Sequence, residues 1–188
     1  IDHKIFKQVL GDMHVSGVEI SSTADVPGGT GLGSSSTFTV GLLNTLYCYK
    51  GRFASKAKLA AEACEVEIEK LKSPIGKQDQ YAAAFGGLNF IRFNQDGTVS
   101  VAPIMMQAET YKKLQKNLMM FYTGTTRSAN GILSEQKKNI AQEDKTKNLL
   151  KMCDLAYEMK DALEHNDVSS FGDILNTGWE LKRSLASG

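Results

Sequence analysis

The sequence predicts a mixed α+β fold, because amphipathic helical patterns alternate with a few short strand-like segments. The first observation is a glycine- and serine-rich stretch at residues 25–37, which follows an alternating segment and runs directly into a helical pattern. The second is a pair of strand-like segments around Asn94-Gln95-Asp96-Gly97, a favourable hairpin turn. The third is a set of apolar stripes with helical spacing at residues 149–163 and 171–185.

The composition is that of an ordinary globular protein of 188 residues, with 41% hydrophobic and 23% charged residues. A net charge of +1 gives no reason to expect nucleic acid or an anionic membrane as a partner. No apolar run approaches the roughly 20 residues that cross a bilayer, and no signal peptide is evident. Cys48, Cys64 and Cys153 are far apart and lie in helical apolar patterns, which predicts reduced, buried thiols in a cytoplasmic protein.

The first half of the chain reads as three helices and one strand. Residues 4–10 resemble a helix that ends at Gly11, and residues 17–25 alternate as a strand that leads into the glycine-rich stretch. A helix follows over 34–49, with Phe38, Leu42 and Leu46 on one face. Ser55 is placed to cap a further helix over 56–71.

The glycine-rich stretch is a candidate anion site. Glycine allows backbone angles closed to other residues, and a loop that opens a helix presents unpaired N–H groups to an anion. The serines that follow could cap the helix or donate hydroxyls to a ligand. A tight connection with a serine cap remains the alternative. Two familiar phosphate-loop patterns fail, because Ser34 stands where one requires a third glycine and the other a lysine.

Glu67 is the most informative residue of the helix over 56–71. It falls within an apolar stripe that includes Ala60, Ala63 and Cys64, and a buried carboxylate without a partner is costly. We therefore expect it to pair with a cation or to bind a metal such as Mg²⁺. A buried salt bridge, or a stripe edge that is wetter than the pattern suggests, is the alternative.

Two further residues stand at helix starts. Asp79 follows a break at Pro74 and Gly76, where an aspartate is either a helix cap or a catalytic group. Arg127 lies at the expected junction between a strand over 118–124 and a helix, and it could hold an anionic group bidentately. A surface arginine is the alternative there.

The pattern P-x-G-x-G-L-G-S-S-S, from Pro27 to Ser36, resembles the nucleotide loop of the GHMP kinases, which include galactokinase, homoserine kinase and mevalonate kinase. Over all 188 residues the chain resembles the branch that converts D-glycero-D-manno-heptose 7-phosphate into the 1,7-bisphosphate. The resemblance implies a two-domain fold, with a ribosomal protein S5 domain 2-like N-terminal domain at 1–105 and the start of a ferredoxin-like C-terminal domain at 115–188. Family motifs expected before Ile1 and after Gly188 are absent, so we expect the central part of a longer enzyme, truncated at both ends.

The resemblance also implies roles for individual residues. The loop would hold the phosphates of ATP, Ser35 and Glu67 would bind Mg²⁺, and Asp79 would orient the acceptor hydroxyl and take its proton. The segment around Asp79 has one residue more than the family pattern. The implied nucleotide-binding residues are Pro27, Gly28, Gly29, Thr30, Gly31, Leu32, Gly33, Ser34, Ser35 and Ser36, and the implied substrate-binding residues are Gly76, Lys77, Gln78 and Arg127.

The implied partner is a small sugar-phosphate substrate, with no nucleic acid and no membrane. Alternatives are a fucose-like sugar, another sugar phosphate or a mevalonate-type alcohol as acceptor, and a catalytically silent family member that senses a ligand. The oligomeric state stays open, with a homodimer as one expectation.

Overall fold

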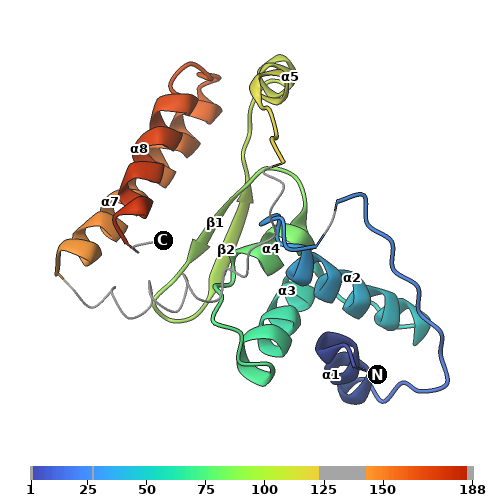
Figure 1. Cartoon of the computed structure of the whole chain (residues 1–188). Coiled ribbons are helices and arrows are strands. Elements are labelled where there is room, and N and C mark those ends of the chain that lie inside the picture. Colours follow the sequence, from blue (N-terminus) through green and yellow to red (C-terminus); the bar gives the residue numbers. More distant parts are fainter. Residues whose placement is uncertain (1, 27, 123–142, 186–188) are drawn as a thin grey trace. The chain divides into compact units, whose positions relative to one another are not determined.

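The computed structural model describes residues 2–26, 28–122 and 143–185 (Figure 1). These residues divide into two compact units, the first at 2–87 and the second at 88–122 and 143–185. Helices dominate both units, and one small sheet lies in the second, so the predicted α+β class is confirmed. No helix within the described ranges has the length and apolar character of a membrane span.

The first unit is built around one long helix, α2 (Ser34–Tyr49). It packs against α1 (Lys4–Asp12), α3 (Lys56–Cys64), the π-helical turn η1 (Glu65–Lys70) and α4 (Gln78–Phe85) (Figure 1). The predicted bounds of α2 are confirmed. Its start contacts η1 and α4, through Ser35 and Gly33 respectively.

Apolar side chains from these helices form the core of the first unit. Val40, Leu43 and Leu46 are buried on α2, and Leu59 and Ala63 face them from α3. Burying an aliphatic side chain of this size contributes roughly 1.5–3 kcal/mol. The apolar face predicted for α2 is thus the face that packs in the core: Leu42 and Leu46 belong to it, and Phe38 packs against it. The remaining core members are Ile5, Val9, Leu10, Leu42, Ala54 and Val66.

Three sequence-based expectations for the first unit were wrong. Gly11 does not end α1, which runs on to Asp12. The helix expected over 56–71 changes at Glu65 to a π-helical turn, in which the Leu71 N–H donates to the Val66 carbonyl five residues earlier. Residues 17–25 form no strand, because an alternating segment needs a hydrogen-bonded neighbour and the described residues supply none.

The described residues of the second unit contain a hairpin and three helices. β1 (Asn89–Phe93) pairs antiparallel with β2 (Val99–Pro103), as predicted. The turn between them closes with the Gly97 N–H donating to the Asn94 carbonyl, and Gly97 has a φ of 85°.

The predicted helices near the C-terminus are confirmed as α7 (Glu143–Glu164) and α8 (Phe171–Arg183), which pack against each other. α5 (Ala108–Asn117) covers most of the segment between the two domains predicted at 1–105 and 115–188. That these residues divide two domains stays a prediction. The helix expected to follow the strand over 118–124, with Arg127 at the junction, lies outside the described residues.

Two further expectations were wrong, one about a strand and one about the burial of cysteines. The strand predicted over 118–124 is absent at 118–122, and these apolar side chains are exposed, since no described strand pairs with them. Cys48 and Cys153 are exposed, because each lies on a helix face that no described element covers; Cys64 alone is buried. All three cysteines are free thiols, as predicted.

Candidate functional site

The glycine-rich loop adopts a conformation that depends on its glycines. Gly29, Gly31 and Gly33 have φ values of 78°, 81° and 67°, in the left-handed region that side chains disfavour. Gly33 is the N-cap of α2, and its carbonyl accepts the first helical hydrogen bond, from the Thr37 N–H at 2.9 Å. Among the described residues, no side chain caps this helix start. The first N–H groups of α2 therefore stay available to an anion, and the helix dipole favours negative charge there.

Glu67 reaches the start of α2 from the π-helical turn η1. Its side chain is 2% exposed, as the apolar stripe predicted. The Ser35 hydroxyl donates to Glu67 Oε1 at 2.8 Å, and the Gln80 side-chain amide donates to Glu67 Oε2 at 2.7 Å. No described lysine or arginine forms an ion pair with this carboxylate, so the salt-bridge alternative finds no support in the described ranges.

Asp79 lies against the last glycine of the loop. It occupies the first turn of α4, is exposed, and has its Cβ and Cγ 3.3 Å from the point where a Cβ on Gly33 would lie. A side chain at position 33 would crowd Asp79 and would be strained at this left-handed φ, so glycine suits the position. The structure therefore brings Ser35, Glu67 and Asp79 together around one helix start.

Gln80 belongs to this cluster, although the sequence analysis did not single it out. Its side chain is fully buried, and its Oε1 has no hydrogen-bond partner among the described residues. A signal was present: at 100° per residue Gln80 shares a helix face with Ala83 and Ala84, which pack against the core. A polar residue on the covered face of α4 marks it as a member of the site.

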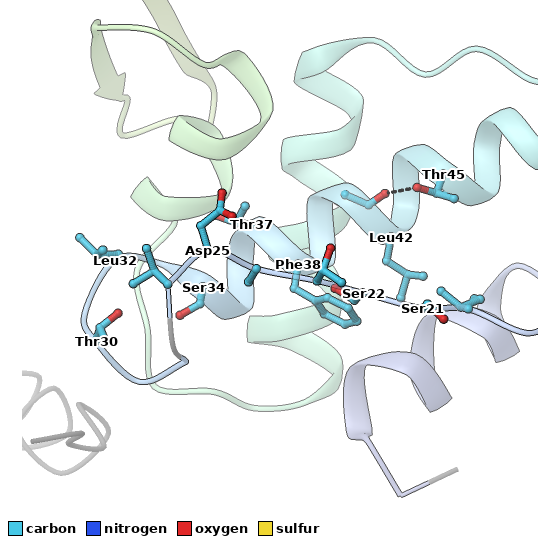
Figure 2. A pocket seen from close by; sticks show the side chains of 15 residues that line it. Ser21, Ser22, Asp25, Thr30, Leu32, Ser34, Thr37, Phe38, Leu42 and Thr45 are labelled. Atoms are coloured by element: carbon cyan, nitrogen blue, oxygen red, sulfur yellow. Dashed lines mark hydrogen bonds between the residues drawn. The ribbon is translucent and has the colours of Figure 1, made fainter.

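A pocket of about 590 Å³ opens beside the loop (Figure 2). One face of α2 forms one wall, with Ser34, Phe38 and Thr45 among its side chains, and residues 20–26 form the other. Hydroxyl-bearing and apolar side chains line it, and Asp25 is its single charged residue among those described. A cavity of this volume is in the usual range for small-molecule sites.

The remaining predicted site residues are less closely joined to this cluster. Gly76, Lys77 and Gln78 precede or begin α4; the Gln78 side chain folds back against Gly76, and Lys77 is exposed. Pro27 and Arg127 lie outside the described residues.

Buried Cys64 lies near the same carboxylate. Burial raises the pKa of its thiol to about 11. The positive charge of Lys77 lowers this pKa, and the negative charge of Glu67 raises it. The thiol is therefore neutral and protonated at physiological pH, so it adds no charge beside Glu67.

The described residues contain no group of three or more histidine, cysteine or acidic side chains that would enclose a metal by itself. They do offer a hydroxyl and a carboxylate in contact, from Ser35 and Glu67. Mg²⁺ prefers hard oxygen ligands and is commonly held by one or two carboxylates together with substrate phosphates. The donor set fits a magnesium ion that arrives with a nucleotide.

Comparison with known families covers the first unit. Residues 3–87 match the family described as "GHMP kinases N terminal domain". This part of the chain belongs to the GHMP kinase family. The resemblance predicted from the loop is thereby confirmed, and GHMP kinases are also found among the similar curated proteins and solved structures.

Three GHMP relatives illustrate the similarity. The D-glycero-alpha-D-manno-heptose 7-phosphate kinase of Campylobacter jejuni is 32% identical over 163 residues, which are 87% of this chain and 48% of that protein. The L-fucokinase/L-fucose-1-P guanylyltransferase of Bacteroides fragilis is 28% identical over 92% of this chain and 18% of its own length. The crystal structure of a D-glycero-D-manno-heptose 1-phosphate kinase from Bacteriodes thetaiotaomicron superposes with a TM-score of 0.72 at 28% identity, over 96% of this chain and 54% of that one.

The chain thus spans about half the length of the heptose-phosphate kinases to which it is similar. The GHMP fold neighbours agree with the mixed α+β architecture.

Proposed function

We propose that this protein is a cytoplasmic, ATP-dependent kinase that transfers a phosphoryl group to a hydroxyl of a small sugar phosphate. The observation that carries the proposal is the convergence of Ser35, Glu67 and Asp79 on a glycine-rich helix start. Exposed N–H groups at such a start suit the phosphates of a nucleotide. Phosphoryl transfer depends mainly on positioning and charge stabilisation, which backbone amides and a metal can supply without a Walker lysine.

In this proposal each side chain has one task. The loop from Gly28 to Ser36 holds the nucleotide phosphates, and Ser35 and Glu67 hold Mg²⁺. The ion, when bound, supplies positive charge that offsets the charge on the phosphates. Asp79 hydrogen-bonds the acceptor hydroxyl and accepts its proton as the new O–P bond forms and the bond between the β- and γ-phosphates breaks, which releases ADP. Lys77, next to the start of α4, adds positive charge near the substrate.

The acceptor we propose is D-glycero-D-manno-heptose 7-phosphate, phosphorylated at its anomeric hydroxyl. The support is the similarity to heptose-phosphate kinases, one of them at 32% identity. A fucose-like sugar is the second candidate, because a fucokinase is similar over 92% of this chain.

The test incubates ATP and Mg²⁺ with the longest natural polypeptide that contains this sequence. Heptose 7-phosphate, fucose and galactose are offered separately, and products are identified by mass spectrometry. A mass gain of one phosphoryl group on heptose 7-phosphate, lost without Mg²⁺, is the expected result. Transfer to fucose alone would favour the second candidate. Binding of ATP without transfer to any acceptor would indicate a ligand sensor.

Glu67→Gln separates the metal role from a structural one. The expected result is a higher Mg²⁺ requirement for turnover, because an amide is a weaker ligand than a carboxylate. An unchanged metal requirement with a lower melting temperature would instead make Glu67 a structural residue.

A further inference from the structure

Gln80 places a side-chain amide in the interior of the first unit. Of its two polar atoms, only the nitrogen has a hydrogen-bond partner among the described residues. The side chain is 0% exposed. Its Nε2 donates to Glu67 Oε2 at 2.7 Å, while Oε1 has no hydrogen-bond partner among the described residues. Most buried side-chain polar atoms are hydrogen-bonded, so a buried acceptor without a partner needs an explanation.

Packing alone does not explain the amide. A side chain of similar length without polar atoms, such as methionine, would fill the same space and leave no acceptor unpaired. What glutamine adds is a donor directed at one oxygen of a buried carboxylate. Its contribution is therefore to the orientation of Glu67.

The hydrogen bonds of Glu67 join three elements. Gln80 on α4 donates to Oε2, and Ser35 on α2 donates to Oε1. With one donor on each oxygen, the plane of the carboxylate is fixed, and Oε1 is held toward the start of α2. Both donors are neutral, so they orient the carboxylate and leave its negative charge in place. A lysine or arginine in the same position would offset that charge.

We infer that Gln80 is a positioning residue, which holds the Glu67 carboxylate in the orientation that a metal-bound nucleotide requires. The inference rests on the proposed function, because it concerns the same metal ligand. Gln80 acts through Glu67 and touches neither nucleotide nor acceptor. Outer partners of this kind typically change metal affinity by about 10–100-fold when they are removed.

The experiment measures binding rather than turnover. A non-hydrolysable ATP analogue is titrated into the longest natural polypeptide that contains this sequence, at increasing Mg²⁺ concentrations, with isothermal calorimetry as the readout. Gln80→Met removes the donor and keeps the length, and Gln80→Leu removes the donor with a shorter apolar side chain. The expected result for both is a Mg²⁺ concentration for half-maximal binding about tenfold or more above wild type. Binding of the analogue without Mg²⁺ should be unchanged.

Gln8→Met is the matched control. Gln8 also donates from Nε2 to a carboxylate oxygen, Asp12 Oδ1 at 2.9 Å, on the surface of α1. Its Mg²⁺ dependence should equal that of wild type.

The outcomes separate the two proposals. If wild type fails to bind the analogue with Mg²⁺, the proposed function is overturned. If wild type binds and Gln80→Met keeps the wild-type Mg²⁺ dependence, Gln80 has only a structural role. Should Gln80→Met fail to fold, Gln80→Leu decides by the same criterion: a wild-type Mg²⁺ dependence in that variant overturns the inference.

Discussion

The two units of the chain differ in what they bury. In the described residues of the first, four polar side chains are buried around α2 and the elements that pack on it: Ser36, Thr39, Glu67 and Gln80. In the second, Thr110 is the one buried polar residue among those described, and its hydroxyl donates to Asn166 Oδ1 at 2.9 Å. Burying polar groups is costly unless they are satisfied, so their concentration in one place needs a cause other than stability.

The second unit shows the opposite imbalance, since it exposes apolar side chains. The run Leu118 to Tyr122 is exposed between 56% and 79%, and Trp179 on α8 is 56% exposed. Exposed apolar groups lower stability in water without supplying donors or acceptors for chemistry. The buried polar side chains thus gather in the first unit, where we propose the ligand site, and the second unit shows no comparable polar cluster in its described residues.

The largest expected effect tests whether chemistry resides in the first unit. Asp79→Asn should lower kcat by about 10²–10⁴-fold, the usual contribution of a general base, because the amide cannot accept the hydroxyl proton. Asp173→Asn is the control, since Asp173 is likewise an acidic residue in the first turn of a helix, α8 of the second unit. Steady-state kinetics with the acceptor proposed above would check both. Near-normal turnover of Asp79→Asn, or equal losses in the two variants, would contradict the assignment.

The next effect concerns two glycines of the first unit. Gly33→Ala should destabilise the protein by about 1–2 kcal/mol, because alanine resists a left-handed φ, and its Cβ would meet Asp79 at 3.3 Å. Gly41→Ala, within the same helix α2 and with nothing within 4 Å of its added Cβ, should stabilise it by about 1 kcal/mol. Urea unfolding measures both. Equal shifts of the same sign would mean that the loop conformation is not what Gly33 maintains.

Local signals explain what could be predicted from the sequence. The bounds of α2, the Ser55 cap and the β1–β2 hairpin follow from residues close together in the chain, and all were confirmed. The burial of Glu67 also followed from local periodicity.

Other features depend on residues far apart in the chain. The contact between Gln80 and Glu67 spans 13 positions and depends on how α4 packs, which helical periodicity does not specify. The strand expected at 17–25 and the one begun at 118 each required a pairing partner, and alternation alone cannot supply one. The π-helical turn has no sequence signature comparable to a cap. The part of the site that was predicted is thus its separate residues, and the part that was missed is the bond network between them.

The three cysteines differ in burial and should therefore differ in reactivity. Cys64 is 6% exposed, and burial raises its pKa to about 11, whereas Cys48 and Cys153 are exposed. Because the thiolate is the nucleophile, iodoacetamide at pH 8 should modify Cys48 and Cys153 at least tenfold faster than Cys64. Peptide mass spectrometry over time gives the three rates, and unfolding in urea should make them similar. Rapid native modification of Cys64 would mean that the interior around Glu67 is open to solvent.

The smallest expected effect belongs to the second unit, at the turn between α7 and α8. The hydroxyl of Ser169 donates to Asp167, as do the Ser169 N–H at 2.8 Å and the Ser170 hydroxyl at 2.9 Å. With the Ser169 hydroxyl as the main cause, these bonds lower the pKa of Asp167 from its ordinary value of 3.8 to about 2. A lowered pKa in the folded state means that the stabilisation is present above pH 3.8 and is lost as the pH falls toward 2.

An NMR titration of the Asp167 carboxyl would therefore show a midpoint near 2. Ser169→Ala should move that midpoint up toward 3.8, because it removes the hydroxyl that contributes most, and Ser170→Ala should move it less. A midpoint of 3.8 in wild type would show that the hydrogen bonds seen at this turn do not persist in solution. The first unit would be unaffected by either serine variant, because these bonds to Asp167 lie at a helix junction of the second unit, apart from the buried polar cluster for which we propose a ligand.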